Sequence, residues 1–359
     1  MLAVKLLVLV VAVVATVSSI KAPCPAFTLR GRSPLPNPLP DTRWCIGRQL
    51  GYSDGTMHNL LPRDRPRRII DSIIFNDELE LLDIRLHTLW DVVDTFVIVE
   101  SNKTFSNKSK PLHFAENAAR YTEFMRKIHH FVMVDPPHLH PGPWEREHVH
   151  RRAQANRNES LKGVPLSTGD LVLMSDVDEV ADPALLAALK SCQGVDVELF
   201  CLDLRFSLYS YEFISKHTPL WSHVHGFMFQ EGAPMPDLGF MRNPSARGPH
   251  GCFSKAGWHC TSCFSELDQF HSKLSSYSHM EFDTPANRYP ATLINRIVNG
   301  LDIAGRASEK FERVAPGSLS APPIVMQNPH CYQYLLDRKQ WLASIMNTTS
   351  PPMNTTSPT

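Results

Sequence analysis

The sequence predicts an α/β protein whose central sheet is mostly parallel and flanked by helices. Two observations support this prediction. Runs of apolar, often β-branched residues occur repeatedly between residues 69 and 191, and they alternate with segments that have the apolar spacing of a helix. An alternation of this kind is typical of parallel strands joined by helices that cover the sheet.

The first strand and the first helix have the clearest patterns. IIDSIIF at 69–75 is an apolar strand, and NDELELLDIRLHTLW at 76–90 carries leucines at helical spacing. Asn76 or Asp77 is expected to cap that helix. Further strands are expected at 92–101, 129–135 and 170–176, and further helices at 114–128, 144–161 and 183–191.

The pattern changes after about residue 195. VELFCLDLRFSLYSYEF at 197–213 predicts long β structure, and helical patterns return only at 290–304 and 332–346. We therefore expect one folded domain over 67–345, with an α/β half at 67–194 and a mixed half at 195–345.

The two ends of the chain have the composition of targeting and flexible segments. A short basic start and an apolar run at 6–17 predict a signal peptide or signal anchor over 1–20. The run is short for a membrane span, which needs about 20 residues, so both interpretations stay open. Either one directs the chain into the secretory pathway, with membrane contact only through this segment. The Pro-rich residues 21–66 are expected to form a stem, and the Ser/Thr/Pro-rich residues 346–359 a disordered tail.

Charge and cysteine content narrow the classes of function. Lys plus Arg and Asp plus Glu number 36 each, so the formal net charge is +0 and nothing in it indicates nucleic-acid binding. In the secretory lumen, an even set of eight cysteines is expected to form disulfides, and Cys24 could pair with Cys45. Cys260 and Cys263 with His259 also resemble a zinc site, which is the alternative. Sequons for N-glycosylation occur at Asn102, Asn107, Asn158, Asn347 and Asn354.

Three carboxylates follow the strand expected at 170–176. In GDLVLMSDVDEVADP (169–183), Asp176, Asp178 and Glu179 stand where ligands bind to a parallel sheet, beyond the carboxyl ends of its strands. Burying these carboxylates without a positive partner would be costly. Their oxygens suit Mg²⁺ or Mn²⁺, and such an ion could neutralise a diphosphate leaving group. The alternative is that Asp178 and Glu179 merely cap the next helix.

Three stretches together resemble glycosyltransferase family 17, over about 67–340. They are SIIFNDELELLDIRLHTLWDVVDTFVIVES (72–101), LMSDVDEVADP (173–183) and GWHCTSCF (257–264). The resemblance implies a GT-A-like fold, a UDP-GlcNAc donor, Mn²⁺ (or Mg²⁺) and inversion at the anomeric carbon. It also implies that the acceptor is the core β-mannose of a glycoprotein N-glycan, in the Golgi lumen. Two alternatives stay open: a UDP-sugar transferase with another acceptor, and a noncatalytic lectin-like secreted protein.

Roles for the donor side follow from these positions. Asp178 is expected to bind the metal directly, and Asp176 to bind the metal, its water or the ribose. Phe75, Asn76 and Asp77, at the end of the first strand, are expected to contact uracil and ribose. The remaining donor-side candidates are Glu100, for a ribose or uracil contact, and Arg151, for a phosphate; their alternatives are an exposed acid and a solvated basic face.

An inverting transfer also needs a general base on the acceptor side. We choose Glu281, with Asp268 as the second candidate, and expect His279 as a further metal ligand. Trp258 and Phe264 could form a platform for a sugar ring, although core packing is the alternative. The other acids considered as bases are Glu231, Asp237, Glu266 and Asp283.

Overall fold

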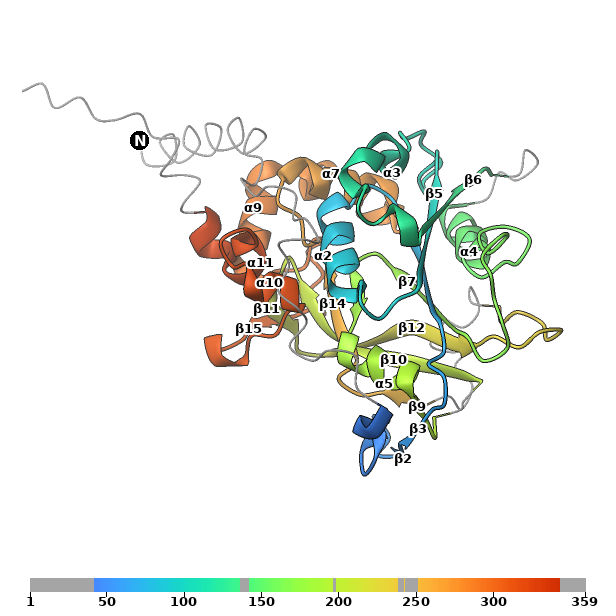
Figure 1. Ribbon diagram of the computed structural model, residues 1–359. Coiled ribbons are helices and arrows are strands. Elements are labelled where there is room, and N and C mark those ends of the chain that lie inside the picture. Colours follow the sequence, from blue (N-terminus) through green and yellow to red (C-terminus); the bar gives the residue numbers. More distant parts are fainter. Residues whose placement is uncertain (1–41, 136–141, 196–197, 238–241, 243–250, 343–359) are drawn as a thin grey trace, which may run out of the picture.

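Figure 1 presents the computed structural model of the chain, which describes residues 42–135, 142–195, 198–237, 242 and 251–342. The segment expected as a signal peptide or signal anchor, residues 21–41 of the expected stem and the tail at 346–359 lie outside the described residues. Among the described helices, none is long and apolar enough to cross a membrane.

One large mixed sheet dominates the described part of the chain. Its main path runs β15 (Phe311–Arg313), β11 (Ser210–Ser215), β10 (Leu199–Leu208), β12 (Leu220–Met228), β7 (Leu171–Asp176), β4 (Ile69–Phe75), β5 (Thr95–Ser101) and β6 (Ile128–Met133). Three shorter strands complete it: β8 (Glu179–Ala181), β13 (Cys252–Phe253) and β14 (Gly257–Thr261).

Parallel pairing along the main path is confined to one half of the sheet. β7, β4, β5 and β6 pair in parallel, whereas β12, β10, β11 and β15 continue the path with antiparallel pairs. Tyr209 alone joins β10 to β11, and a connection this short permits only antiparallel pairing. The expectation of a mostly parallel sheet therefore holds for residues 69–176 and not for the whole sheet.

Helices cover both faces of the parallel strands. Figure 1 shows α2 (Leu79–Leu89) and α4 (Pro143–Ala153) on opposite sides of β4, β5 and β7. Alternate strand residues enter two separate cores: Ile69 and Ile73 pack on the α2 side, and Ile70 packs on the α4 side. The other α-helices are α3 (His113–Glu116), α5 (Pro183–Ser191), α7 (Leu267–Ser276), α8 (Pro285–Arg288), α9 (Pro290–Asn299), α10 (Pro323–Gln327) and α11 (Gln333–Leu336).

Several expected helices are shorter or more broken than their patterns indicate; the one expected at 290–304, for example, is α9 and ends at Asn299. The helix expected at 114–128 is α3 followed by two 3₁₀ turns, Ala118–Tyr121 and Met125–Lys127. The helix expected at 144–161 ends at Ala153, where the Asn156 side chain accepts a hydrogen bond from the Asn158 N–H (2.9 Å) and favours a turn. The helix expected at 332–346 is interrupted at Asp337: α11 ends at Leu336, and residues 338–342 are helical again. The remaining 3₁₀ turns are Thr42–Cys45, Met280–Phe282 and Pro316–Ser318.

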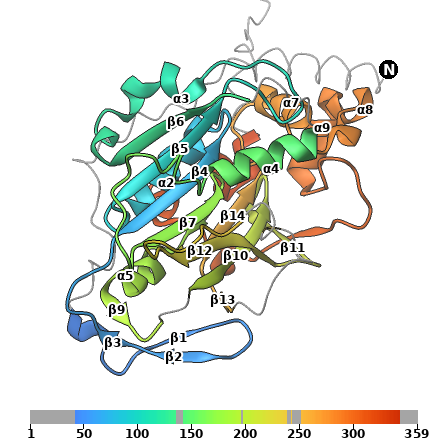
Figure 2. The same cartoon turned by 90° about the vertical axis from the view of Figure 1, so that its right-hand side faces the viewer.

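Residues 42–66 are folded onto the domain, although they were expected in the stem. β1 (Gln49–Gly51) and β2 (Met57–Asn59) form a hairpin, and β3 (Leu61–Pro62) pairs with β9 (Cys192–Gln193). Figure 2 shows these strands below the main sheet. A disulfide between Cys45 and Cys192 ties the segment down, so the local pairing of Cys24 with Cys45 is wrong.

Two further disulfides hold the second half of the sheet. Cys201 of β10 bonds to Cys252 of β13, and Cys260 of β14 bonds to Cys263. Because both sulfurs of the C-x-x-C motif are joined to each other, they are not zinc ligands in this structure.

Candidate active site

The acidic turn 176–179 links the two halves of the sheet. It leaves β7 at Asp176 and enters β8, which pairs with β14, the strand that carries GWHCT. Arg85 of α2 supports the turn, because its guanidinium donates to the backbone carbonyls of Asp176 (3.1 Å) and Glu179 (2.6 Å). Arg85 is itself held by Asp71 of β4 (Nε–Oδ2, 2.7 Å). This buried pair therefore positions the turn.

Arginine side chains supply the positive charge that the acidic turn requires. Arg151 of α4 donates to both carboxylate oxygens of Asp176 (2.7 and 3.1 Å). Arg242 donates to Asp176 (3.0 Å) and to both oxygens of Glu179 (2.8 and 2.9 Å). The Trp221 indole N–H also donates to Glu179. No hydrogen bond from either arginine to Asp178 is seen in the described residues; the His259 ring lies next to it, with Nε2 at 3.5 Å from Oδ2.

The two arginines keep Asp176 and Glu179 ionised. Burial by itself would raise the pKa of Asp176, but Arg151 and Arg242 outweigh burial and hold that pKa well below its usual range. Burial also opposes ionisation of Glu179, where Arg242 prevails and lowers the pKa to about 2. The pKa of Lys273 is raised although burial opposes this, because Asp178 and Glu78 lie nearby. At neutral pH the site therefore combines ionised carboxylates with three cationic side chains.

Three hollows meet at this cluster. The α4 cavity, about 520 Å³, is bordered by Arg151, Arg242 and Lys273 together with Phe105, Trp144, Glu147, His148 and His223. The β10 cavity, about 350 Å³, is bordered by Asp178, His259, Phe206 and Phe311, and by the segment around Asp302 and Arg306. The strand-end pocket, about 70 Å³, lies where β4 and β5 end. Five residues border both larger cavities: Asp176, Trp221, Lys273, Tyr277 and His279.

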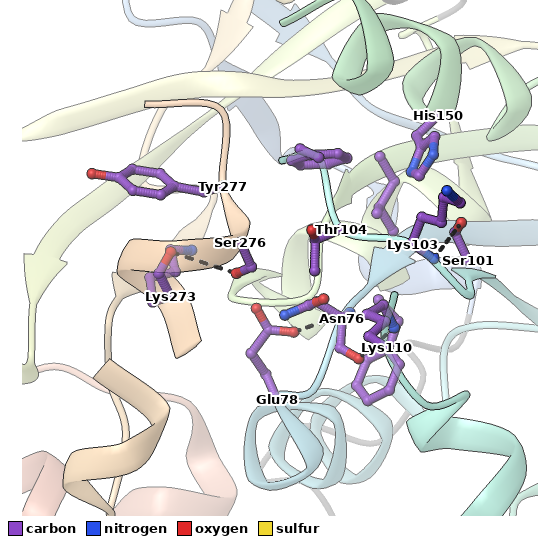
Figure 3. Close-up of a pocket in the computed structure, with 13 residues that line it drawn as sticks. Asn76, Glu78, Ser101, Lys103, Thr104, Lys110, His150, Lys273, Ser276 and Tyr277 are labelled. Carbon is purple, nitrogen blue, oxygen red and sulfur yellow. Dashed lines mark hydrogen bonds between the residues drawn. The ribbon is translucent and has the colours of Figure 1, made fainter. Parts of the chain in front are cut away.

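The strand-end pocket contains two of the expected uridine contacts. Phe75 and Asn76 line it, as does Glu78, whose carboxylate accepts the backbone N–H of Asn76 (3.2 Å). Figure 3 shows Asn76 and Glu78 on one side of the pocket and Lys273 and Ser276 on the other. Burial, with the nearby charge of Asp77, raises the pKa of Glu78 to about 7. Glu78 is a pocket residue that the sequence analysis missed.

Two other expected uridine contacts have structural partners instead. Asp77 accepts a hydrogen bond from the Ser272 hydroxyl (2.6 Å) and so ties α7 to the end of β4. Glu100 is fully buried, neither a pocket residue nor an exposed acid, and it accepts the Phe114 N–H (2.8 Å) and faces His130 Nε2 (3.0 Å).

The expected general bases lie outside all three hollows. Asp268 stands in the first turn of α7 with 74% of its side chain exposed. Glu281 is 56% exposed and is hydrogen-bonded to His279 (Oε1 to Nδ1, 2.6 Å). That hydrogen bond lowers the pKa of Glu281, which makes it a weaker base.

The expected set of three metal ligands does not form. Within the described residues, no three His, Cys, Asp or Glu side chains are grouped so that they could hold a metal ion. Asp176 is bonded to arginines and His279 to Glu281, so Asp176, Asp178 and His279 are not one ligand group. A hard divalent ion can, however, bind to one or two carboxylates together with substrate phosphates and water. Asp178, with no hydrogen bond from an arginine in the described residues and a place on the β10 cavity, fits that smaller requirement.

The aromatic walls of the β10 cavity are also not the expected ones. Trp258 donates to the Ser320 hydroxyl (2.9 Å), and Phe264 packs in the core. Phe206 and Trp221 border the cavity instead, with the His259 ring stacked on Phe206 at 5.0 Å between centroids. Aromatic faces of this kind suit the apolar faces of sugar rings.

An ionised acidic turn, three cations and adjoining cavities at the ends of parallel strands define an α/β enzyme site suited to a phosphorylated substrate. The family model "Glycosyltransferase family 17" matches residues 49–341, and the chain belongs to this family of glycosyltransferases. This confirms the resemblance found in the sequence.

Curated relatives agree with this assignment. The chain is 28% identical over 309 residues to β-1,4-mannosyl-glycoprotein 4-β-N-acetylglucosaminyltransferases of Homo sapiens, Rattus norvegicus and Mus musculus. The match covers 79% of this chain and 57% of each relative, so the chain spans little more than half the length of these relatives. No solved structure matches the chain significantly.

Proposed function

We propose that this chain transfers N-acetylglucosamine from UDP-GlcNAc to the core β-mannose of N-glycans, forming the β-1,4-linked bisecting branch. Family membership supports sugar transfer, and the activity for which the relatives are named supports the donor and acceptor. The proposal also gives residues 67–194 the role of the nucleotide-sugar half of a GT-A-like fold, and residues 195–345 the role of the acceptor half.

One observation carries the donor part of this proposal. Arg151, Arg242 and Lys273 converge on the α4 cavity beside the acidic turn. Arginine forks match phosphate oxygens, and fixed cations stabilise the charge that develops on a leaving diphosphate. The α4 cavity is therefore assigned to the diphosphate, and the strand-end pocket with Phe75 and Asn76 to the uridine.

The acceptor belongs on the other side of the acidic turn. The β10 cavity has aromatic faces at Phe206 and Trp221, and it is contiguous with the α4 cavity through five shared residues. An acceptor sugar there lies opposite the diphosphate, which suits inversion at the anomeric carbon.

Asp178 would hold the Mn²⁺ or Mg²⁺ that the family resemblance implies, together with substrate phosphates and water. A bound divalent ion adds positive charge against the departing diphosphate. The arginines act on the same charge, and Arg85 keeps the turn in place for both.

The proposed location is the Golgi lumen, with the N-terminal segment either retained as a type II anchor or cleaved to release the protein. Disulfides across the domain support an oxidising compartment. The sequon residues Asn102, Asn107 and Asn158 are exposed and so accessible to glycosylation.

A donor screen tests the proposal. The purified chain is incubated with several UDP-sugars and a biantennary N-glycan, with Mn²⁺ or with a chelator, and the product linkage is determined by NMR. We expect transfer of GlcNAc from UDP-GlcNAc alone, in β-1,4 linkage to the core mannose, and only with the metal. Transfer of another sugar would make the chain a different UDP-sugar transferase. Glycan binding without turnover, unchanged by the chelator, would make it a lectin-like protein.

A further inference from the structure

The transfer step must take place where the donor and acceptor cavities meet. The five residues common to the α4 and β10 cavities are Asp176, Trp221, Lys273, Tyr277 and His279. The donor's anomeric carbon and the acceptor hydroxyl have to approach to about 3–3.5 Å at this junction. The residues common to both cavities are therefore the first candidates for the group that removes the hydroxyl proton.

Four of the five are unsuited to accept that proton. Trp221 has only a donor N–H, which is bonded to Glu179. Both carboxylate oxygens of Asp176 already accept hydrogen bonds from Arg151, and one of them also accepts from Arg242. Burial raises the pKa of Tyr277 to about 12, so its hydroxyl stays protonated at neutral pH. Lys273 is a cation whose pKa is raised by Asp178 and Glu78 although burial opposes this.

His279 is held in a way that suits a base. Its Nδ1 is hydrogen-bonded to Glu281 (2.6 Å), which favours the tautomer that carries its proton on Nδ1 and leaves Nε2 free to accept one. In the part of the chain that the structure describes, Nε2 makes no hydrogen bond. The Trp144 and Phe282 rings pack against the imidazole at 4.5 and 5.3 Å between centroids and fix its plane.

We propose that His279 is the general base of the transfer and that Glu281 is a positioning residue that orients it. This inference rests on the proposed function. It replaces the two sequence-based roles, in which Glu281 was the base and His279 a metal ligand.

Transfer takes place as one displacement at the anomeric carbon. Nε2 of His279 takes the proton of the acceptor hydroxyl while the hydroxyl oxygen forms a bond to the anomeric carbon of the sugar. The bond from that carbon to the diphosphate oxygen breaks, and its electron pair leaves with UDP. Glu281 stabilises the imidazolium, and Arg151, Arg242 and Lys273 face the charge on UDP. The imidazolium then returns its proton to water.

Three variants test this assignment, in the full chain with UDP-GlcNAc and a biantennary N-glycan. His279→Gln is expected to lower kcat by about 10²- to 10⁴-fold, the usual contribution of a general base, while UDP affinity changes less than about three-fold. Glu281→Gln is expected to lower kcat by about ten-fold. Because the imidazolium loses a neighbouring negative charge, the acidic limb of the kcat/KM profile should move to lower pH.

The control is His271→Gln. His271 lies on α7 near Asp268 (3.9 Å), a second histidine–carboxylate pair that borders none of the three hollows, and its loss should leave kcat within about two-fold. Circular dichroism and UDP binding show whether each variant is folded. The other charged or titratable groups bordering the two cavities around His279 are Glu147, His148, Arg151, Asp176, Asp178, His223, Arg242, His259, Lys273, Tyr277, Asp302, Arg306 and Glu309.

The outcomes separate the two proposals. If the wild-type chain transfers GlcNAc and folded His279→Gln keeps more than about a third of kcat, the base assignment is overturned and the proposed function stands. An unmoved pH profile in Glu281→Gln overturns the positioning role of Glu281. If the wild-type chain transfers no sugar, the proposed function and the base assignment fall together.

Discussion

Asp178→Asn is expected to lower the rate of sugar transfer by about 10³-fold, because the positive charge that a metal adds to a transition state is worth several kcal/mol. Asp178 is the carboxylate of the acidic turn that accepts no hydrogen bond from an arginine in the described residues, and it borders the β10 cavity. The amide keeps the shape of the side chain, so the melting temperature should change by no more than a few degrees. Calorimetric titration with Mn²⁺ should show weaker binding, independently of turnover.

The matched control for this prediction is Asp268→Asn. The Asp268 side chain is 74% exposed and lies outside the three hollows, so the transfer rate of the Asp268→Asn protein should stay within about two-fold of wild type. A folded Asp178→Asn protein that kept a tenth of the wild-type rate and its Mn²⁺ affinity would contradict the role given to Asp178.

Arg85→Met is expected to lower the free energy of unfolding by about 3–5 kcal/mol, the usual cost of removing one partner of a buried ion pair. Arg85 and Asp71 are both buried, and the substitution would leave Asp71 without its charged partner. The carbonyls of Asp176 and Glu179 would also lose their donor. Urea denaturation with the disulfides intact measures this loss, and the m-value should be unchanged.

The double variant Arg85→Met with Asp71→Val separates charge burial from lost packing. It removes the unpaired charge and should recover about half of the lost stability. Transfer should stay impaired in this variant, because the acidic turn still lacks its support. If the free energy of unfolding of Arg85→Met lies less than about 1 kcal/mol below that of the wild type, the Arg85–Asp71 pair does not hold the turn.

Local patterns predicted several elements of the α/β half of the domain. The strand expected at 69–75 is β4 with the same bounds, and the helix expected at 183–191 is α5. Both are apolar segments with clear ends, and Asp182 caps α5 by accepting the backbone N–H of Ala184 (2.7 Å). The acidic turn after β7 was also predicted from the sequence, because its carboxylates interrupt an apolar run.

Contacts between distant parts of the chain were not predictable in this way. Arg242 lies 66 residues beyond Asp176, and no local pattern marks it as the partner of the acidic turn. In the sequence, Lys273 is one polar residue of a helix that also carries the exposed Asp268, so the helix pattern does not mark it as a site residue. Glu100 was placed correctly at the end of a strand, but its partners come from α3 and β6. The disulfides and the antiparallel half of the sheet depend on the same kind of long-range pairing.

Titration of UDP and of uridine by isothermal calorimetry tests most directly whether the cations beside the acidic turn bind a diphosphate. Lys273 borders all three hollows, and a charge-assisted hydrogen bond is worth about 1.5–3 kcal/mol. Lys273→Met should therefore weaken UDP binding by about ten- to hundred-fold, leave uridine binding within about three-fold, and reduce the salt dependence for UDP. The exposed Lys216→Met, at a lysine paired with Glu312, should change neither ligand. Equal UDP affinity in wild type and a folded Lys273→Met protein would show that Lys273 does not bind the diphosphate.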